Sequence, residues 1–296
     1  MKLENVLRLP EDSSIQSYTD ATKKNLSLVL SSDTNETLPE SFMVFLENLD
    51  HGIQHTHNVY KKALEIADIL EEESGEKTNK ALIYVMAVMH DSGRFHLSDN
   101  HSKQDKCERQ HNKCGVAQIR LFQKRLRSKG YDLDEGQISS IMDYIYNHDY
   151  MTERLDGAKL KEPDSLEGQI VRLADRVSTD VREEVRRYWE TGKRRNTPLI
   201  KDGISLQDRV EFSFDKIGEY IKAGKLDQMM FFFALISISP SDFSHPQLAK
   251  IYGNWSREKE DSIDEIMLIA EEEGYDKEKV RAVIDQYLDY FNINLK

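Results

Sequence analysis

The 296-residue chain has few residues that break helices, because it contains only 14 glycines and 6 prolines. It also lacks the alternation of apolar and polar residues that is typical of strands, whereas apolar residues recur at helical spacing along most of its length. This composition predicts an all-α protein. Two cysteines are too few for a disulfide framework, and without a signal peptide they indicate a reducing cytoplasm, where we expect the protein to reside.

Long apolar runs and an excess of positive charge are absent as well. The longest apolar run, residues 229–238, is about half as long as a membrane-spanning helix, so it predicts a core helix and no membrane partner. The 41 Lys and Arg residues against 53 Asp and Glu residues give a net charge of -12. That charge argues against binding of extended nucleic acid, although a local basic groove stays open.

The periodic segments predict three regions. Residues 1–48 contain a helix over 15–30 and a second helix opened by Pro39, which together form an N-terminal helical cover. Residues 49–198 form the core, and residues 199–296 form a C-terminal helical extension packed on that core. We therefore expect a helical bundle with additional helices at both ends.

The residues that carry chemistry begin with His90 and Asp91. They follow the apolar segment 81–88, which has the length of a buried helix and whose start Thr78 is expected to cap. An imidazole and a carboxylate side by side on buried backbone are costly unless something offsets the charge, and a divalent metal accepts both. Arg94 follows as a fixed cation. The alternative interpretation is a helix-end histidine beside a capping aspartate.

Four further side chains lie near the end or on one face of other expected helices, namely His55, His111, His148 and Asp175. A helical bundle can bring ligands from facing helices to one point, together with the pair His90 and Asp91. Imidazole and carboxylate ligands without thiolate suit Mn, Fe, Mg or Zn, with Co and Ni as further candidates.

Three stretches of the chain resemble the motifs of the HD superfamily of metal-dependent phosphohydrolases. They are His51-Gly52-Ile53-Gln54-His55-Thr56-His57-Asn58-Val59, His90-Asp91-Ser92-Gly93-Arg94 and Leu173-Ala174-Asp175-Arg176. His111 and His148 match additional histidines that are found in some branches of the superfamily. The resemblance covers residues 50–177, which is under half of the chain.

This resemblance implies a fold, a reaction and a set of roles. The fold is an HD-domain helical bundle. The reaction is hydrolysis of a phosphoester or phosphoanhydride bond in a small phosphorylated molecule, with a nucleotide as the expected partner, by metal-activated water. The implied metal ligands are His55, His90, Asp91 and Asp175 for one ion, with His111 and His148 for a second ion or for substrate phosphate. The implied catalytic residues are Asp91, Arg94 and His111, and the implied substrate-binding residues are His51, Arg94 and Arg176.

Two questions stay open within this resemblance. The first is the ligand from the first motif, for which His57 rivals His55; we prefer His55 because it stands four residues before Val59, in the family's register. The second is the number of metal ions. Branches that cleave cyclic dinucleotides carry paired histidines, a glutamate and a glycine-tyrosine-proline signature, whereas residues 147–150 read Asn-His-Asp-Tyr and no such signature follows.

Other functions also stay open. The chain could be a non-catalytic nucleotide-binding or regulatory module, or a nuclease or cyclic-nucleotide phosphodiesterase. Cys107, His111 and Cys114 lie at positions i, i+4 and i+7 of one helical face and could form a structural zinc site, with His101 as a fourth ligand. The sequence leaves a homo-oligomer open and does not identify the substrate.

Overall fold

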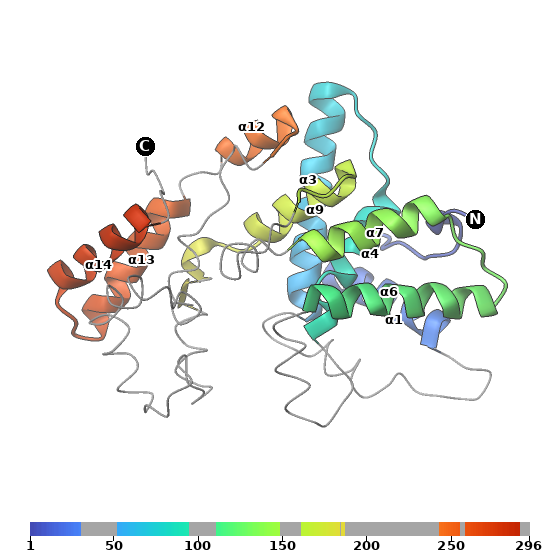
Figure 1. Ribbon diagram of the computed structural model, residues 1–296, viewed down its shortest axis with the longest axis horizontal. Helices are drawn as coiled ribbons and strands as arrows, with labels where there is room; N and C mark the ends of the chain where they lie inside the picture. Colours follow the sequence, from blue (N-terminus) through green and yellow to red (C-terminus); the bar gives the residue numbers. More distant parts are fainter. Residues whose placement is uncertain are drawn as a thin grey trace. The chain divides into compact units, whose positions relative to one another are not determined.

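The computed structural model describes residues 1–30, 52–94, 111–148, 161–183, 185–186, 243–254 and 258–290. In these ranges the regular structure is helical and contains no strand (Figure 1), which confirms the predicted all-α class. The predicted helices at Pro39 and at 229–238 lie outside the described residues. None of the described helices is long and apolar enough to cross a lipid bilayer.

The chain divides into two compact units, and the three predicted regions stay a prediction. The first unit contains Met1–Glu153, Ala158–Ser178 and Ser241–Ile251. The second unit contains Arg154–Gly157, Thr179–Pro240 and Tyr252–Lys296.

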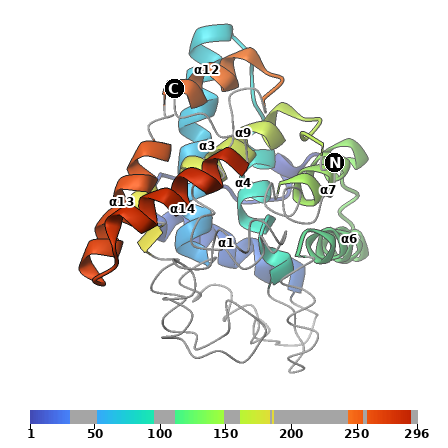
Figure 2. The ribbon, with the colours of Figure 1, turned by 60° about the vertical axis from the view of Figure 1, so that its left-hand side comes forward.

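The helices of the first unit surround one apolar helix. They are η1 (Leu3–Asn5), α1 (Ile15–Leu30), α3 (Ile53–Ser74), α4 (Lys80–Met89), η2 (Ser92–Arg94), α6 (His111–Ser128), α7 (Glu135–Asn147) and α9 (Leu166–Val177). Every residue of α4 from Ala81 to Met89 is buried, as expected for a helix with apolar residues on all sides. It packs against α3, α7 and α9, and Figure 2 shows it between α3 and α7. In Figure 1, α6 and α7 run side by side, and they pack on each other.

Local signals set the ends of these helices. Helix α3 ends at Gly75, which adopts a left-handed conformation with φ 73° that favours glycine. Asn79 is the N-cap of α4, and its side chain accepts hydrogen bonds from the backbone amides of Ala81 and Leu82. The prediction of Thr78 as this cap was wrong, because both the backbone N–H and the hydroxyl of Thr78 donate to Glu71 Oε1.

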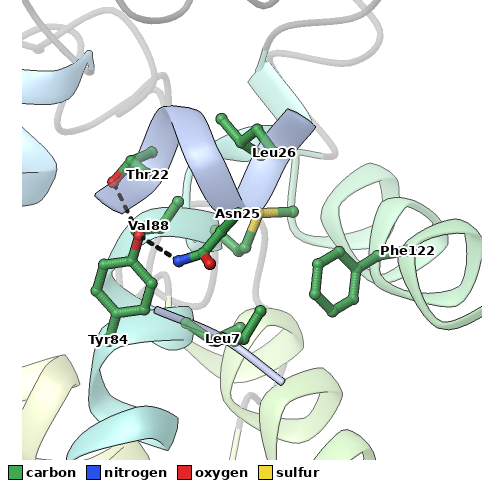
Figure 3. A pocket seen from close by; sticks show the side chains of 9 residues that line it. Leu7, Thr22, Asn25, Leu26, Tyr84, Val88 and Phe122 are labelled. Atoms are coloured by element: carbon green, nitrogen blue, oxygen red, sulfur yellow. Dashed lines mark hydrogen bonds between the residues drawn. The ribbon is translucent and has the colours of Figure 1, made fainter. Parts of the chain in front are cut away.

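The segment before α3 packs on the core through polar contacts as well as apolar ones. The amide of Asn25 in α1 accepts from the backbone N–H of Arg8 at 2.9 Å and donates to its carbonyl oxygen at 2.7 Å. It also donates to the hydroxyl of Tyr84 in α4, which lies 3.0 Å from the hydroxyl of Thr22. Figure 3 shows the two contacts of the Tyr84 hydroxyl in a small apolar pocket, which Leu7 and five other apolar side chains also line.

The second unit contains a helical hairpin. Helices α13 (Glu258–Glu272) and α14 (Lys277–Tyr290) pack on each other, and Gly274 between them has φ 79°. Two arginines that follow α9 in the chain bind α13: Arg182 forms an ion pair with Asp261 at 2.7 Å, and Arg186 forms one with Glu272 at 3.0 Å. Helix α12 (Pro246–Asn254) spans the boundary between the two units in the sequence.

Candidate metal centre

Six side chains predicted as metal ligands lie together in the first unit. They form two clusters, His55 with His90 and Asp175, and Asp91 with His111 and His148. Helix α3 carries the first of these residues and α9 carries Asp175. The others lie at the ends of α4, α6 and α7, so the bundle brings helix ends to one point.

The first cluster has the spacing of ligands around one ion. The Nε2 atoms of His55 and His90 are 3.1 Å apart, and Oδ1 of Asp175 lies 3.2 Å and 3.5 Å from them. Ligands about 2.1 Å from a metal stand about 3.0 Å apart in an octahedral arrangement and about 3.4 Å apart in a tetrahedral one. The three donor atoms therefore fit a divalent metal.

The second cluster is slightly wider. The Nε2 atoms of His111 and His148 are 3.3 Å apart. Oδ1 of Asp91 lies 3.7 Å from the first of these atoms and 3.9 Å from the second. These separations lie somewhat above the spacing for one ion, so a modest contraction would bring the three donors to that spacing.

Asp91 lies between the two clusters. Its Oδ2 atom is 3.4 Å from Nε2 of His90 and 3.9 Å from Nε2 of His55, whereas its Oδ1 atom faces the second cluster. The side chain is buried, with only 4% of its surface exposed. One carboxylate thus presents one oxygen to each cluster.

Helix ends fix the orientation of two imidazoles. His90 is the C-cap of α4, and its Nδ1–H donates to the carbonyl oxygen of Ala87 at 2.8 Å. His148 is the C-cap of α7, and its Nδ1–H donates to the carbonyl oxygen of Ile145 at 2.7 Å. In the neutral form each ring therefore presents the lone pair of Nε2 to the centre. The carbonyl ends of both helices also favour positive charge there.

The electrostatics of the first cluster call for a cation. Burial lowers the pKa of His90, but the carboxylates of Asp91 and Asp175 outweigh it and raise that pKa well above its ordinary value. Burial raises the pKa of Asp175, but His90 and His55 lower it well below its ordinary value. The two carboxylates thus hold positive charge among the imidazoles, and a divalent cation supplies the same charge.

The turn after His90 and Asp91 packs closely on the start of α6. A Cβ atom at Gly93 would lie 1.9 Å from the carbonyl oxygen of His111, and one at Gly115 would lie 2.7 Å from the side chain of Ile145. Gln118 donates from Nε2 to the carbonyl oxygen of Ser92 at 2.9 Å. The turn that carries Asp91 is thus held against the helix that begins at His111.

Sequence reasoning missed Gly115 and Gln118 as supporting residues. The available signal was their spacing, because they stand four and seven residues after His111 and thus share its helical face.

Among the remaining candidates, His57 and Arg176 have described side chains, and neither belongs to these clusters. His57 is buried and its Nε2 lies 2.9 Å from the carbonyl oxygen of Ser13, so α3 directs His55, not His57, toward the centre. Arg176 follows Asp175 in α9 and is half-buried. Arg94 ends η2, but its side chain lies outside the described residues, as does all of His51.

The zinc alternative gains no support in the part of the chain that the structure describes. Cys114 in α6 belongs to neither cluster, whereas His111 joins the second one. Cys107 and His101 lie outside the described residues.

Comparison with known proteins gives one match. Residues 52–180 match the family model described as HD domain. No curated protein matches the chain, and no solved structure does.

Proposed function

Because residues 52–180 belong to the HD-domain superfamily, we propose that the chain is a metal-dependent phosphohydrolase. Its substrate class is a small phosphorylated molecule, with a nucleotide as the preferred candidate, and the bond cleaved is a phosphoester or a phosphoanhydride. The observation that carries the proposal is the convergence of four imidazoles and two carboxylates in two clusters of ligand spacing.

The donor set supports one or two divalent ions. His55, His90 and Asp175 would hold one ion, and His111 and His148 would hold another, with Asp91 contributing an oxygen to each. A divalent ion at such a centre polarises a phosphoryl oxygen and lowers the pKa of water toward neutrality.

The protein's own residues would orient and bind the reactants. Asp91 would accept a hydrogen bond from the attacking water, a role that the position of its carboxylate between the clusters supports. Arg94, Arg176 and His51 are proposed to hold the negative charge of the phosphate through charge-assisted hydrogen bonds. His111 would support them from the second cluster. Four of the six candidate ligands are buried, and electrostatic interactions are stronger at a buried centre than in water.

Elemental analysis of the purified protein tests the proposal. The protein is prepared without chelator and without an affinity-column metal, alongside His90→Ala and the control His245→Ala. The control removes a histidine that pairs with Glu76 at 2.8 Å, outside both clusters. We expect bound Mn, Fe, Mg, Zn, Co or Ni in the wild type and in the control, and its loss in His90→Ala. Absence of metal from all three proteins, even after addition of excess Mn, would refute the proposal.

Turnover separates the enzyme from the alternatives. Metal-loaded protein is incubated with a panel of nucleoside monophosphates, nucleoside triphosphates, cyclic nucleotides and short oligonucleotides, and phosphate release or strand cleavage is measured. Hydrolysis of small nucleotides supports the proposal. Binding without turnover would favour the regulatory module, and cleavage of the cyclic or polymeric substrates alone would favour the phosphodiesterase or nuclease. A cytoplasmic location and a homo-oligomeric state stay predictions.

A further inference from the structure

Tyr144 has a buried hydroxyl that forms no hydrogen bond with the part of the chain that the structure describes. The residue lies in α7 and is 0% exposed, and its hydroxyl oxygen has no partner among those residues. The buried tyrosine in α4 differs, because the hydroxyl of Tyr84 bonds to two side chains of α1. An unsatisfied buried hydroxyl lowers stability, and phenylalanine would fill the same space without that cost. The hydroxyl at position 144 therefore requires an explanation.

The position of Tyr144 supplies one. It stands one helical turn before His148, and the centres of the two rings are 5.8 Å apart. Burial, followed by the charges of Asp175 and Asp91, raises the pKa of Tyr144 well above its ordinary value. The hydroxyl thus lies in the field of one carboxylate from each cluster. Neither carboxylate, nor any other residue that the structure describes, accepts a hydrogen bond from it, so the hydroxyl is available as a donor to a ligand at the centre.

We propose that Tyr144 is a substrate-binding residue whose hydroxyl donates a hydrogen bond to a phosphoryl oxygen held at the centre. This inference rests on the proposed function. A phenol suits this place better than a lysine or an arginine would, because a cation beside Asp91 and Asp175 would pair with them and compete with the metal. The neutral phenol adds a donor for the oxyanion and leaves both carboxylates to the metal.

Two matched variants test the inference. Tyr144→Phe removes only the hydroxyl. Tyr18→Phe is the control, because Tyr18 is also 0% exposed and loses only a hydroxyl in the same way. The ring of Tyr18 packs instead on His57, Tyr60 and Tyr84, and Tyr18 stands in α1, which carries no residue of either cluster.

Binding of inorganic phosphate to the Mn-loaded proteins is measured by calorimetry, together with metal content and melting temperature. We expect Tyr144→Phe to bind phosphate about 10- to 100-fold more weakly, which corresponds to one hydrogen bond to a charged acceptor. Its metal content should equal that of the wild type, and its melting temperature should stay the same or rise. Tyr18→Phe should bind phosphate like the wild type.

Each other outcome would overturn the inference. Unchanged phosphate affinity in Tyr144→Phe would show that the hydroxyl does not reach the oxyanion, and would leave the proposed function intact. Loss of metal or a clear fall in melting temperature would show that the hydroxyl has a structural partner instead. If Mn-loaded wild-type protein does not bind phosphate, both the proposed function and this inference fail.

Discussion

Replacing Gly93 by alanine tests whether close packing between η2 and α6 holds the two clusters together. The added Cβ would lie 1.9 Å from the carbonyl oxygen of His111 and 2.5 Å from the backbone nitrogen of Gly115. The first distance is about 1.6 Å inside an ordinary contact. Because both neighbouring atoms belong to the backbone, no side-chain rotation relieves the overlap, and η2 has to move away from α6.

The size of that movement determines the effect. Overpacking of a core costs about 1–3 kcal/mol, and the hydrogen bond from Gln118 to the carbonyl oxygen of Ser92, 2.9 Å long, contributes about 1 kcal/mol more if it breaks. We therefore expect Gly93→Ala to lower the free energy of unfolding by roughly 2–4 kcal/mol. Metal sites tolerate errors of only about 0.2 Å in ligand distance. A shift of Asp91 away from His111 should thus lower the metal content or the metal affinity.

Urea unfolding and elemental analysis after Mn loading measure both effects. Gly253→Ala is the control, because a Cβ at this exposed position in α12 meets no atom within 4 Å. It should leave metal content unchanged and raise stability by up to about 1 kcal/mol, as alanine favours helices over glycine. Wild-type stability together with wild-type metal content in Gly93→Ala would refute the reasoning.

Three further predictions concern charge, packing and pH. Asp91→Asn should lower the bound metal more than Asp175→Asn does at equal free Mn, because Asp91 presents an oxygen to each cluster. Equal metal content in the two variants would contradict a role of Asp91 in both clusters. Asn25→Ala should lower the free energy of unfolding by about 2–3 kcal/mol without altering metal content, because it removes three hydrogen bonds, two to the backbone of Arg8 and one to the hydroxyl of Tyr84. A loss below about 0.5 kcal/mol in urea unfolding, which is about half of one net hydrogen bond, would count against it. Burial and then Tyr84 raise the pKa of Tyr60 to about 12. The contribution of protonated Tyr60 to the free energy of unfolding is therefore complete below the unfolded pKa of about 10. It is lost as the pH rises to about 12, at about 1.4 kcal/mol per pH unit. Tyr60→Phe should make the fall in stability over this interval less steep, and an unchanged slope would refute the assignment.

Much of the fold follows from periodicity along the sequence. The apolar segment 81–88 predicts a helix buried on all sides, and α4 is such a helix. The HD-domain resemblance, carried by the residues around His90 and Asp91, is confirmed by the family match over 52–180. These features are readable because a histidine and an aspartate are rare on buried backbone, so their presence after an apolar helix already points to a cation.

Contacts between distant segments could not be read in the same way. The sequence shows Gly93 only as a residue that ends a helix, whereas the structure shows it against the backbone of His111, 18 residues later. The prediction of the N-cap of α4 failed for a related reason. The hydroxyl of Thr78 donates to Glu71 of the preceding helix, and Asn79 caps α4 instead. Local propensity ranks both residues as good caps, and a tertiary contact decides between them.

The two C-cap histidines show how a helical bundle can build a metal centre at low cost. The last carbonyl oxygens of a helix have no partner within the helix. His90 and His148 each donate from Nδ1–H to such an oxygen, in the residue three positions earlier. The same hydrogen bond turns the Nε2 lone pair inward, so a group that stabilises the helix end also orients a ligand. Both helices direct their carbonyl ends, which carry partial negative charge, at the region where Asp91 already lies. Each of these features favours a cation, and Asp91 connects the two clusters because it follows one of the two capping histidines directly in the chain.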